Sequence, residues 1–459
     1  MANRSAGAEI NIRKVPARFL KVLVVFVMEI KPSTSLEEAA TTSVAPGGAS
    51  SRARRSLVPF YVLRNRNYAL LFWGQLISAV GSQMQVVAVA WQVYLLTHSA
   101  LALGLIGLMQ ALPRLLFSLV GGVLADVLNR RQMLLIVNII MMLLSVAVAL
   151  CTAFQAINLI VIFLFILCNA TTSSFEFPTR QAIIPHLISR EQLADAIALD
   201  SVMVYFIAVV GATVGGLTLA WLGIANVYWL NVVSYLVVIV SLLLLRVPSI
   251  PAEKRAQAGL KALSEGIRFL RTHPVILALL TLDFCATFFA SPRALLPVYA
   301  RDIMHIGPQG LGLLLAAGGI GGMALTPFMG LITRIRRQGL GVALAIIIWG
   351  LCIIAFGLFP NPFWLGFLFL VGEGAADMTS VLLQGIVVQY ITPDELRGRI
   401  SSVAAMFVIG GPMLGQCESG LIAGLFTPMF SIVSGGVVCI LAVVLILVLV
   451  PGLIKVEVR

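Results

Sequence analysis

Residues 122–131 read GVLADVLNRR and follow an apolar run, and residues 330–337 read GLITRIRR after another apolar run. A second pair of loops repeats in the same way, with ISREQLADAI at 188–197 and ITPDELRGRI at 391–400. The offset from 122 to 330 is close to the offset from 188 to 391. Equivalent loops at similar offsets indicate that the chain consists of two copies of one unit, joined in tandem.

The composition around these loops is that of a protein dissolved in lipid. Of the 459 residues, 60% are hydrophobic and only 11% are charged, whereas a soluble domain has about 25% charged residues. Lipid cannot satisfy backbone amides, so spanning segments must be helices or a closed barrel. The apolar runs have about 20 residues or more, which favours helices over strands of roughly ten residues. The composition excludes a soluble protein.

The apolar runs set the number of spans. Each run is long enough to cross a hydrocarbon core of about 30 Å. Roughly twelve are expected, at residues 68–96, 101–124, 133–154, 158–179, 199–222, 226–246, 275–298, 309–331, 340–359, 362–387, 401–424 and 428–450. The predicted fold class is an all-α integral membrane protein with about 12 transmembrane helices in two six-helix pseudo-repeat bundles.

Lys and Arg gather in every second junction between the runs. They occur before residue 68, near 130 and 180–190, throughout 246–273, and near 334–337, 397–399 and 455–459. The intervening junctions contain only Arg301, beside Asp302. The positive-inside rule therefore predicts a multi-pass protein of the cell (inner) membrane with both termini in the cytoplasm. The same placement argues against nucleic-acid binding as the reason for the net charge of +12.

Four regions are expected along the chain. Residues 1–58 are predicted to be a flexible extension, 59–246 the N-terminal bundle, 247–274 a cytoplasmic linker, and 275–459 the C-terminal bundle. Within the linker, Leu260–Leu270 has the spacing of an amphipathic surface helix. Parallel repeats of this kind are a transporter architecture, with the substrate site where the repeats meet. The expected partners are the bilayer and a small-molecule substrate, and the protein is expected to be monomeric.

Charged residues inside predicted spans are costly and are treated as functional candidates. Glu373 and Asp377 are four apart and share a helix face, and Asp283 lies in another span. Such carboxylates could carry a proton, as a proton antiporter requires. Arg114 could pair with a carboxylate or hold an anionic substrate. The alternative for all four is a structural ion pair or a water-facing side chain.

Other polar residues in the spans could line a substrate cavity or bond to a neighbouring helix. The cavity candidates, besides Arg114, are Gln83, Gln110, Asn169 and Gln384. Arg293, Glu418 and Asp200 lie nearer span ends and are weaker candidates. The six cysteines and four histidines have no metal-ligand spacing, and no catalytic constellation or P-loop is present in the sequence. We expect no metal, no cofactor and no enzymatic activity.

The loop at 122–131 resembles the loop between helices two and three of the major facilitator superfamily, G-x-x-x-D-R-x-G-R-[RK]. Gly122, Asp126, Arg130 and Arg131 fit this pattern, whereas Val127 and Asn129 depart from it. The resemblance implies a cytoplasmic latch that locks one conformation. Glu176 and Arg180, at the end of the fourth span, are the expected partners of the latch. The alternative is a positively charged turn without a conformational role.

A second resemblance points to one branch of this superfamily. WQVYLLTHSALALG at 91–104, FPTRQA at 177–182 and TPDELRGR at 392–399 resemble the branch that contains the enterobactin exporter and drug:proton antiporters. Gly211 and Gly215, and likewise Gly411, Pro412 and Gly415, resemble the antiporter motif G-P-x-x-G-G. These residues are expected either to act as a hinge or to allow close helix packing.

The predicted function is secondary active transport by alternating access. The resemblance implies proton-coupled efflux of amphipathic small molecules, drug-like compounds or a siderophore, with the proton gradient as the energy source. The alternatives are an importer or uniporter of a metabolite, a polytopic membrane enzyme acting on lipid, and a non-transporting scaffold or sensor.

Overall fold

A computed structural model of the chain describes residues 59–127, 129–189, 192–245, 268–270, 272–393 and 396–456. All of these belong to one compact unit, Leu57–Arg459. The expected extension at 1–58 and most of the expected linker, including the larger part of Leu260–Leu270, lie outside the described residues.

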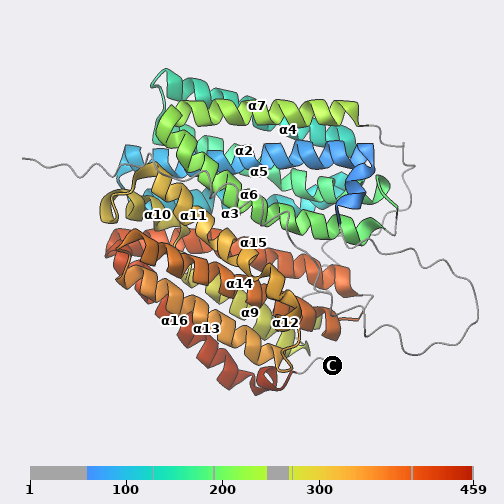
Figure 1. Cartoon of the computed structure of the whole chain (residues 1–459), viewed down its shortest axis with the longest axis vertical. Coiled ribbons are helices and arrows are strands. Elements are labelled where there is room, and N and C mark those ends of the chain that lie inside the picture. The colour runs from blue at the N-terminus through green and yellow to red at the C-terminus, as the bar shows by residue number, and fades with distance from the viewer. Residues whose placement is uncertain are drawn as a thin grey trace, which may run out of the picture. The chain divides into compact units, whose positions relative to one another are not determined.

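The first half of the chain forms six long helices, which Figure 1 shows in blue to yellow-green. They are α2 (Arg66–Thr97), α3 (Ala100–Val127), α4 (Arg130–Ala153), α5 (Leu159–Ile183), α6 (Leu193–Leu222) and α7 (Ile224–Leu244). Three of these helices have an asparagine as the N-cap residue. The side chains of Asn65, Asn129 and Asn158 accept hydrogen bonds from the first-turn amides of α2, α4 and α5. Each cap satisfies amides that a helix start leaves free.

The second half repeats this arrangement. Its long helices are α9 (Pro274–Phe289), α11 (Gly307–Leu325), α13 (Gln338–Leu358), α14 (Phe363–Ile391), α15 (Arg397–Leu425) and α16 (Pro428–Leu449). Short helical segments extend α9 and α11, namely η7 (Arg293–Leu295), α10 (Leu296–Val298), η8 (Tyr299–Ile303), η9 (Thr326–Phe328) and α12 (Met329–Ile332). Within each half the outer helices pack in pairs, α4 with α7 and α13 with α16 (Figure 1).

Eleven described helical segments are long and apolar enough to cross a membrane. The remaining long helix, α15, has 29 residues and a length of about 43 Å. It is less apolar because it carries Gln416 and Glu418. The predicted all-helical membrane fold is confirmed.

The seventh span differs from the continuous helix expected over 275–298. α9 ends at Phe289, and Ser291-Pro292 separates it from η7 and α10. Proline cannot donate a backbone hydrogen bond and restricts the residue before it, so the helix ends before this point. The break places Arg293 at the start of η7, five residues before the end of the expected span.

The halves meet most closely at one end. A Cβ atom added to Gly104 of α3 would lie 2.8 Å from Gly420 Cα of α15, and one added to Gly216 of α6 would lie 2.7 Å from Gly312 Cα of α11. All four glycines lie near the helix ends that are remote from Arg130 and Arg131. Only glycine permits such close backbone approach. We call the end with the clustered arginines the basic end, and the other the closed end.

A buried polar network connects helices within the first half. The Gln85 side-chain oxygen accepts hydrogen bonds from Ser145 Oγ at 2.9 Å and from Asn231 Nδ2 at 2.7 Å. Ser234 Oγ in turn donates to Asn231 Oδ1 at 2.9 Å. The network links α2, α4 and α7 by polar contacts where lipid offers no alternative partner.

Candidate transport cavity

A cavity of about 700 Å³ lies between the two halves. Its wall combines α2, α3, α5 and α6 of the first half with η7, α10, α11 and α15 of the second. This volume is within the range of small-molecule sites. Among the described residues, most of the wall is apolar, with Val86, Val89, Leu103, Ile106, Phe165, Ile166, Phe177, Val204, Ile207 and Leu315 as examples.

Four of the five predicted cavity residues line this wall: Gln83, Gln110, Arg114 and Asn169. The fifth, Gln384, is not among the lining residues. Its side chain is buried in α14, and its Oε1 atom has no hydrogen-bond partner among the described residues. The rotation of α14 therefore directs Gln384 into protein and not into the cavity.

Arg114 is held where the halves meet. It follows Pro113 within α3, and its Nη1 atom lies 3.8 Å from the sulfur of Met413 in α15. Met413 follows Pro412, which also lines the cavity. A thioether is a weak acceptor, so this contact positions the guanidinium without neutralising it.

Arg293, which the sequence analysis treated as a weaker candidate, is the second cation of the wall. It lines the cavity from η7, and its side chain is exposed although the neighbouring Ala294 is buried. The signal in the sequence was Ser291-Pro292, which breaks the span just before Arg293.

The three predicted proton-coupling carboxylates belong to the second half. Asp283 of α9 is 4% exposed, and Glu373 and Asp377 of α14 are half-buried. Asp377 interacts electrostatically with both of the others, and Arg293 interacts with Glu373 and Asp377. None of the three lines the cavity. We call Asp283, Glu373 and Asp377 the carboxylate cluster. Arg293 lines the cavity and interacts with two of its members.

Within the described part of the chain, no member of the carboxylate cluster forms a salt bridge. Among the described residues, the salt bridges are Arg180–Asp200 at 3.4 Å and Arg301–Asp302 at 3.9 Å. No hydrogen bond is formed by the side chains of Asp283, Glu373 or Asp377 within the described part of the chain. These observations argue against the alternative of a structural ion pair.

Glu373 sits at a tight crossing of two helices. A Cβ atom added to Gly318 of α11 would lie 3.3 Å from Glu373 Oε2, and one added to Gly321 would lie 2.7 Å from the Ala375 backbone nitrogen. Because α11 also packs against α6, the carboxylate lies beside an element that contacts both halves.

The expected latch residues lie at the basic end. Arg130 Nη1 donates to the Ala182 carbonyl at 2.8 Å, and Arg131 donates to the carbonyls of Leu242 and Leu243 at 2.7 and 2.8 Å. These bonds satisfy carbonyls at the ends of α5 and α7. Arg180 pairs with Asp200 of α6, whereas Glu176 acts electrostatically on Arg114 and Arg180. Gly122 and Asp126 lie in α3, but side chains 118–128 are outside the described part.

The glycines of the antiporter-like motifs make packing contacts. A Cβ atom at Gly211 would lie 2.7 Å from Gln83 Cβ, and one at Gly215 would lie 2.9 Å from Met84 Cα. Gly411 and Gly415 of α15 face α9 in the same way, Gly415 at 2.7 Å from Phe288 Cα. These contacts join α6 to α2 and α15 to α9 within each half.

A polar cluster joins the halves at the closed end. Tyr94 of α2 donates a hydrogen bond to the Asp302 carboxylate of η8. The Arg301 guanidinium lies 5.9 Å from the centre of the Tyr94 ring, and its Nη1 atom donates to His98 Nδ1 at 3.5 Å. The first distance is typical of a cation–π contact.

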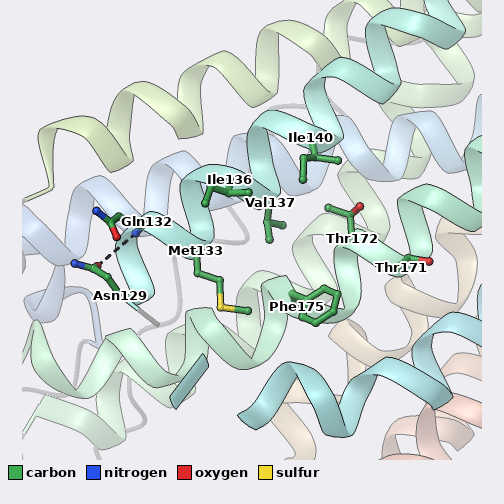
Figure 2. Close-up of a pocket in the computed structure, with 9 residues that line it drawn as sticks. All are labelled: Asn129, Gln132, Met133, Ile136, Val137, Ile140, Thr171, Thr172 and Phe175. Atoms are coloured by element: carbon green, nitrogen blue, oxygen red, sulfur yellow. Dashed lines mark hydrogen bonds between the residues drawn. The ribbon is translucent and has the colours of Figure 1, made fainter. Parts of the chain in front are cut away.

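A second, smaller cavity of about 290 Å³ lies between α4 and α5 (Figure 2). Figure 2 shows Met133, Ile136 and Val137 facing Phe175, with the cap from Asn129 to Gln132 at one end. Its described lining contains no charged side chain, and it draws on one half only. The central cavity is therefore the better candidate for transport.

Within the described residues, no group of three or more His, Cys, Asp or Glu side chains could hold a metal ion. The six cysteines are free thiols.

Comparison with known proteins gives the family and the fold. The transmembrane secretion effector family matches residues 57–457. The enterobactin exporter EntS of Shigella boydii serotype 18 is 29% identical over 385 residues, which cover 83% of this chain and 92% of the exporter. EntS of Escherichia coli O81 has the same identity and coverage.

Solved transporters share the fold. A bacterial homolog of the human lysosomal transporter Spinster, inward-facing and unoccupied, has a TM-score of 0.67 at 16% identity, covering 87% of this chain and 98% of that chain. A bacterial homologue of the iron transporter ferroportin, also inward-facing, has a TM-score of 0.64 at 16% identity, with coverages of 85% and 99%. The family is one of transporters and not of enzymes. With its duplicated helical halves and central cavity, the chain belongs to the transmembrane secretion effector family of the major facilitator superfamily.

Proposed function

We propose that this protein is a proton-coupled exporter of amphipathic small molecules that works by alternating access. The observation that carries the proposal is the central cavity, which is built from both halves and combines an apolar wall with a few polar and charged groups. A cavity at the repeat interface is where transporters of this architecture bind substrate. The export direction is supported by the similarity to the enterobactin exporter.

Proton coupling is assigned to the carboxylate cluster. A coupling group must gain and lose a proton during the cycle, so a carboxylate held in a permanent ion pair would serve poorly. Asp283, Glu373 and Asp377 have no such pair among the described residues. Arg293 both lines the cavity and interacts with Glu373 and Asp377. A substrate that contacts Arg293 would therefore change the electrostatic interaction of this arginine with the proton-binding carboxylates.

The alternating-access proposal assigns a direction to the two ends. The positive-inside rule supports a cytoplasmic position for the basic end, and the similarity to the enterobactin exporter supports a location in the cytoplasmic membrane. Close contacts between Gly104 and Gly420 and between Gly216 and Gly312 shut the closed end. The conformation is therefore interpreted as inward-facing. Substrate would enter from the cytoplasm or the inner leaflet, and opening of the closed end would release it outside.

The test uses inside-out membrane vesicles energised to an acid interior, with a pH-sensitive dye and a panel of amphipathic compounds. Addition of a transported compound is expected to release protons from the lumen. Asp377→Asn should abolish this release at normal expression. Glu418 is a carboxylate on α15 outside the cluster, so Glu418→Gln is the matched control. This variant should retain proton release.

Unimpaired proton release in Asp377→Asn would contradict the role of that residue. Tolerance of neutral substitutions at Asp283, Glu373 and Asp377 together would contradict proton coupling through the cluster and favour a scaffold.

A further inference from the structure

We propose that the substrate is an amphipathic anion, held between Arg114 of the first half and Arg293 of the second. This inference rests on the proposed function, because it names the substrate class for the same cavity. It is carried by the charges of the cavity wall, by the lack of a salt bridge to either arginine among the described residues, and by the placement of one arginine in each half.

The charges that line the cavity are all positive. Arg114 and Arg293 are in the wall, and no Asp or Glu is among the described lining residues. The polar remainder includes Gln83, Gln110 and Asn169, whose side-chain amides can donate hydrogen bonds. A ligand in this cavity therefore meets two cations and several amide donors.

Neither arginine is neutralised by contact with a carboxylate. The salt bridges among the described residues involve Arg180 and Arg301 and neither of these two. Carboxylates do act on them from a distance: Glu176 on Arg114, and Glu373 and Asp377 on Arg293. These three carboxylates are not among the lining residues, so they leave the guanidinium groups available to a ligand.

An anion would satisfy both guanidinium groups directly. Arginine presents planar donors that match a carboxylate, phosphate or sulfonate, and such charge-assisted bonds are roughly twice as strong as neutral ones. The weak contact of Arg114 with Met413 at 3.8 Å is easily replaced by a stronger acceptor. A cationic ligand would instead meet like charge in a poorly solvated place, which disfavours its binding.

The rest of the wall specifies the remainder of the ligand. Phe165, Phe177, Val89, Ile106 and Leu315 present apolar surface from four helices. Burial of apolar area contributes roughly 25 cal/mol per Å². A hydrophilic anion would forgo this contribution, so the cavity favours an anionic head group on an aromatic or aliphatic body.

The placement of the two arginines connects binding with the transport cycle. Arg114 belongs to α3 and Arg293 to η7, so a ligand that contacts both joins the halves. Arg293 also interacts with Glu373 and Asp377. A bound anion and the carboxylate cluster therefore compete for the same cation.

The test measures binding without a proton gradient, so that it does not depend on the proposed coupling. Purified protein in nanodiscs is titrated calorimetrically with three probes of similar size: 1-naphthaleneacetate, 1-naphthaleneacetamide and 1-naphthalenemethylamine. Empty nanodiscs correct for partition into lipid. The anion is expected to bind at least tenfold more tightly than either of the other probes.

Arg114→Gln and Arg293→Gln should each weaken anion binding about tenfold or more and leave the amide unaffected. Arg114→Lys and Arg293→Lys keep the positive charge and should retain part of the preference for the anion. They separate loss of the charge from loss of the fold. Arg334→Gln removes an exposed arginine at the basic end and is the matched control, expected to bind as wild type.

Three results would overturn the proposal: equal binding of the three probes, preference for the cation, or unchanged anion preference in both Gln variants. A folded wild-type protein that binds none of the probes would also contradict it. Failure of the proposed proton-coupled export gives a different result from failure of the anion proposal. Loss of proton coupling leaves this binding preference intact, whereas proton-coupled export of cations alone would support the function and exclude an anionic substrate.

Discussion

Tyr94 donates a hydrogen bond to the carboxylate of Asp302, and so joins α2 of the first half to η8 of the second. Tyr94 is 3% exposed, and Arg301 lies over its ring. The contact lies at the closed end, beyond the cavity. It therefore opposes separation of the halves at that end.

Tyr94→Phe should weaken this closure selectively. The substitution keeps the ring and its contact with Arg301, but it removes the donor to Asp302. A hydrogen bond to a charged group contributes about 1.5–3 kcal/mol, so the population open at the closed end should rise roughly tenfold or more. Distances between spin labels on Thr97 and Gly424, measured by electron double resonance, should shift toward the longer state. An unchanged distance distribution would show that the contact does not hold this end shut.

Close packing of glycines at the closed end predicts a second effect. Ala normally stabilises a helix interior relative to Gly by about 0.8–1 kcal/mol. In Gly216→Ala the added Cβ would lie 2.7 Å from Gly312 Cα, so the halves must move apart. We expect slower transport together with increased labelling of cysteines placed near the closed end.

Gly385→Ala on α14 is the control for this substitution. Nothing lies within 4 Å of a Cβ atom at Gly385, so transport and labelling should match the wild type. Equal behaviour of the two variants would mean that the contact between Gly216 and Gly312 does not limit the cycle.

The network around Gln85 predicts that replacement of Asn231, which does not itself line the cavity, lowers the stability of the protein. Asn231→Leu removes the donor at 2.7 Å from Gln85 and the acceptor of Ser234. Polar contacts between membrane helices contribute about 0.6–1.7 kcal/mol, so unfolding in detergent should occur at a lower temperature by an amount corresponding to about 1–2 kcal/mol.

Asn226→Leu is the comparison for that measurement. Asn226, in the first turn of α7, is exposed and donates a hydrogen bond to the Leu222 carbonyl at the end of α6. Its replacement should change the unfolding temperature much less. A larger effect at Asn226 than at Asn231 would contradict the role assigned to the buried network.

The bilayer made much of the fold predictable. A segment must be apolar over about 20 residues to cross the hydrocarbon core, so the expected spans and the described helices agree closely. For example, the segment expected at 428–450 is α16, Pro428–Leu449. Hydropathy does not report where a helix breaks inside a span. Ser291-Pro292 interrupts an apolar run without lowering its overall hydropathy much, so the break before Arg293 was not expected.

The cavity was only partly predictable, because membership in its wall depends on helix rotation. Gln83, Gln110, Arg114 and Asn169 line it, whereas Gln384 is turned into protein. A helix that is apolar on all sides gives no sequence signal for the face that points inward. Contacts across the halves, such as that between Tyr94 and Asp302, join positions far apart in the chain and had no local pattern to indicate them.

Proton flux through the purified protein tests the central claim most directly. Proteoliposomes containing only this protein and an internal pH indicator would be loaded with a substrate and diluted to create a substrate gradient without an initial pH gradient. Substrate efflux should drive protons inward and acidify the lumen, with Glu418→Gln behaving as wild type and Asp377→Asn moving substrate without protons. Substrate efflux with no change in luminal pH in the wild-type protein would contradict proton-coupled export.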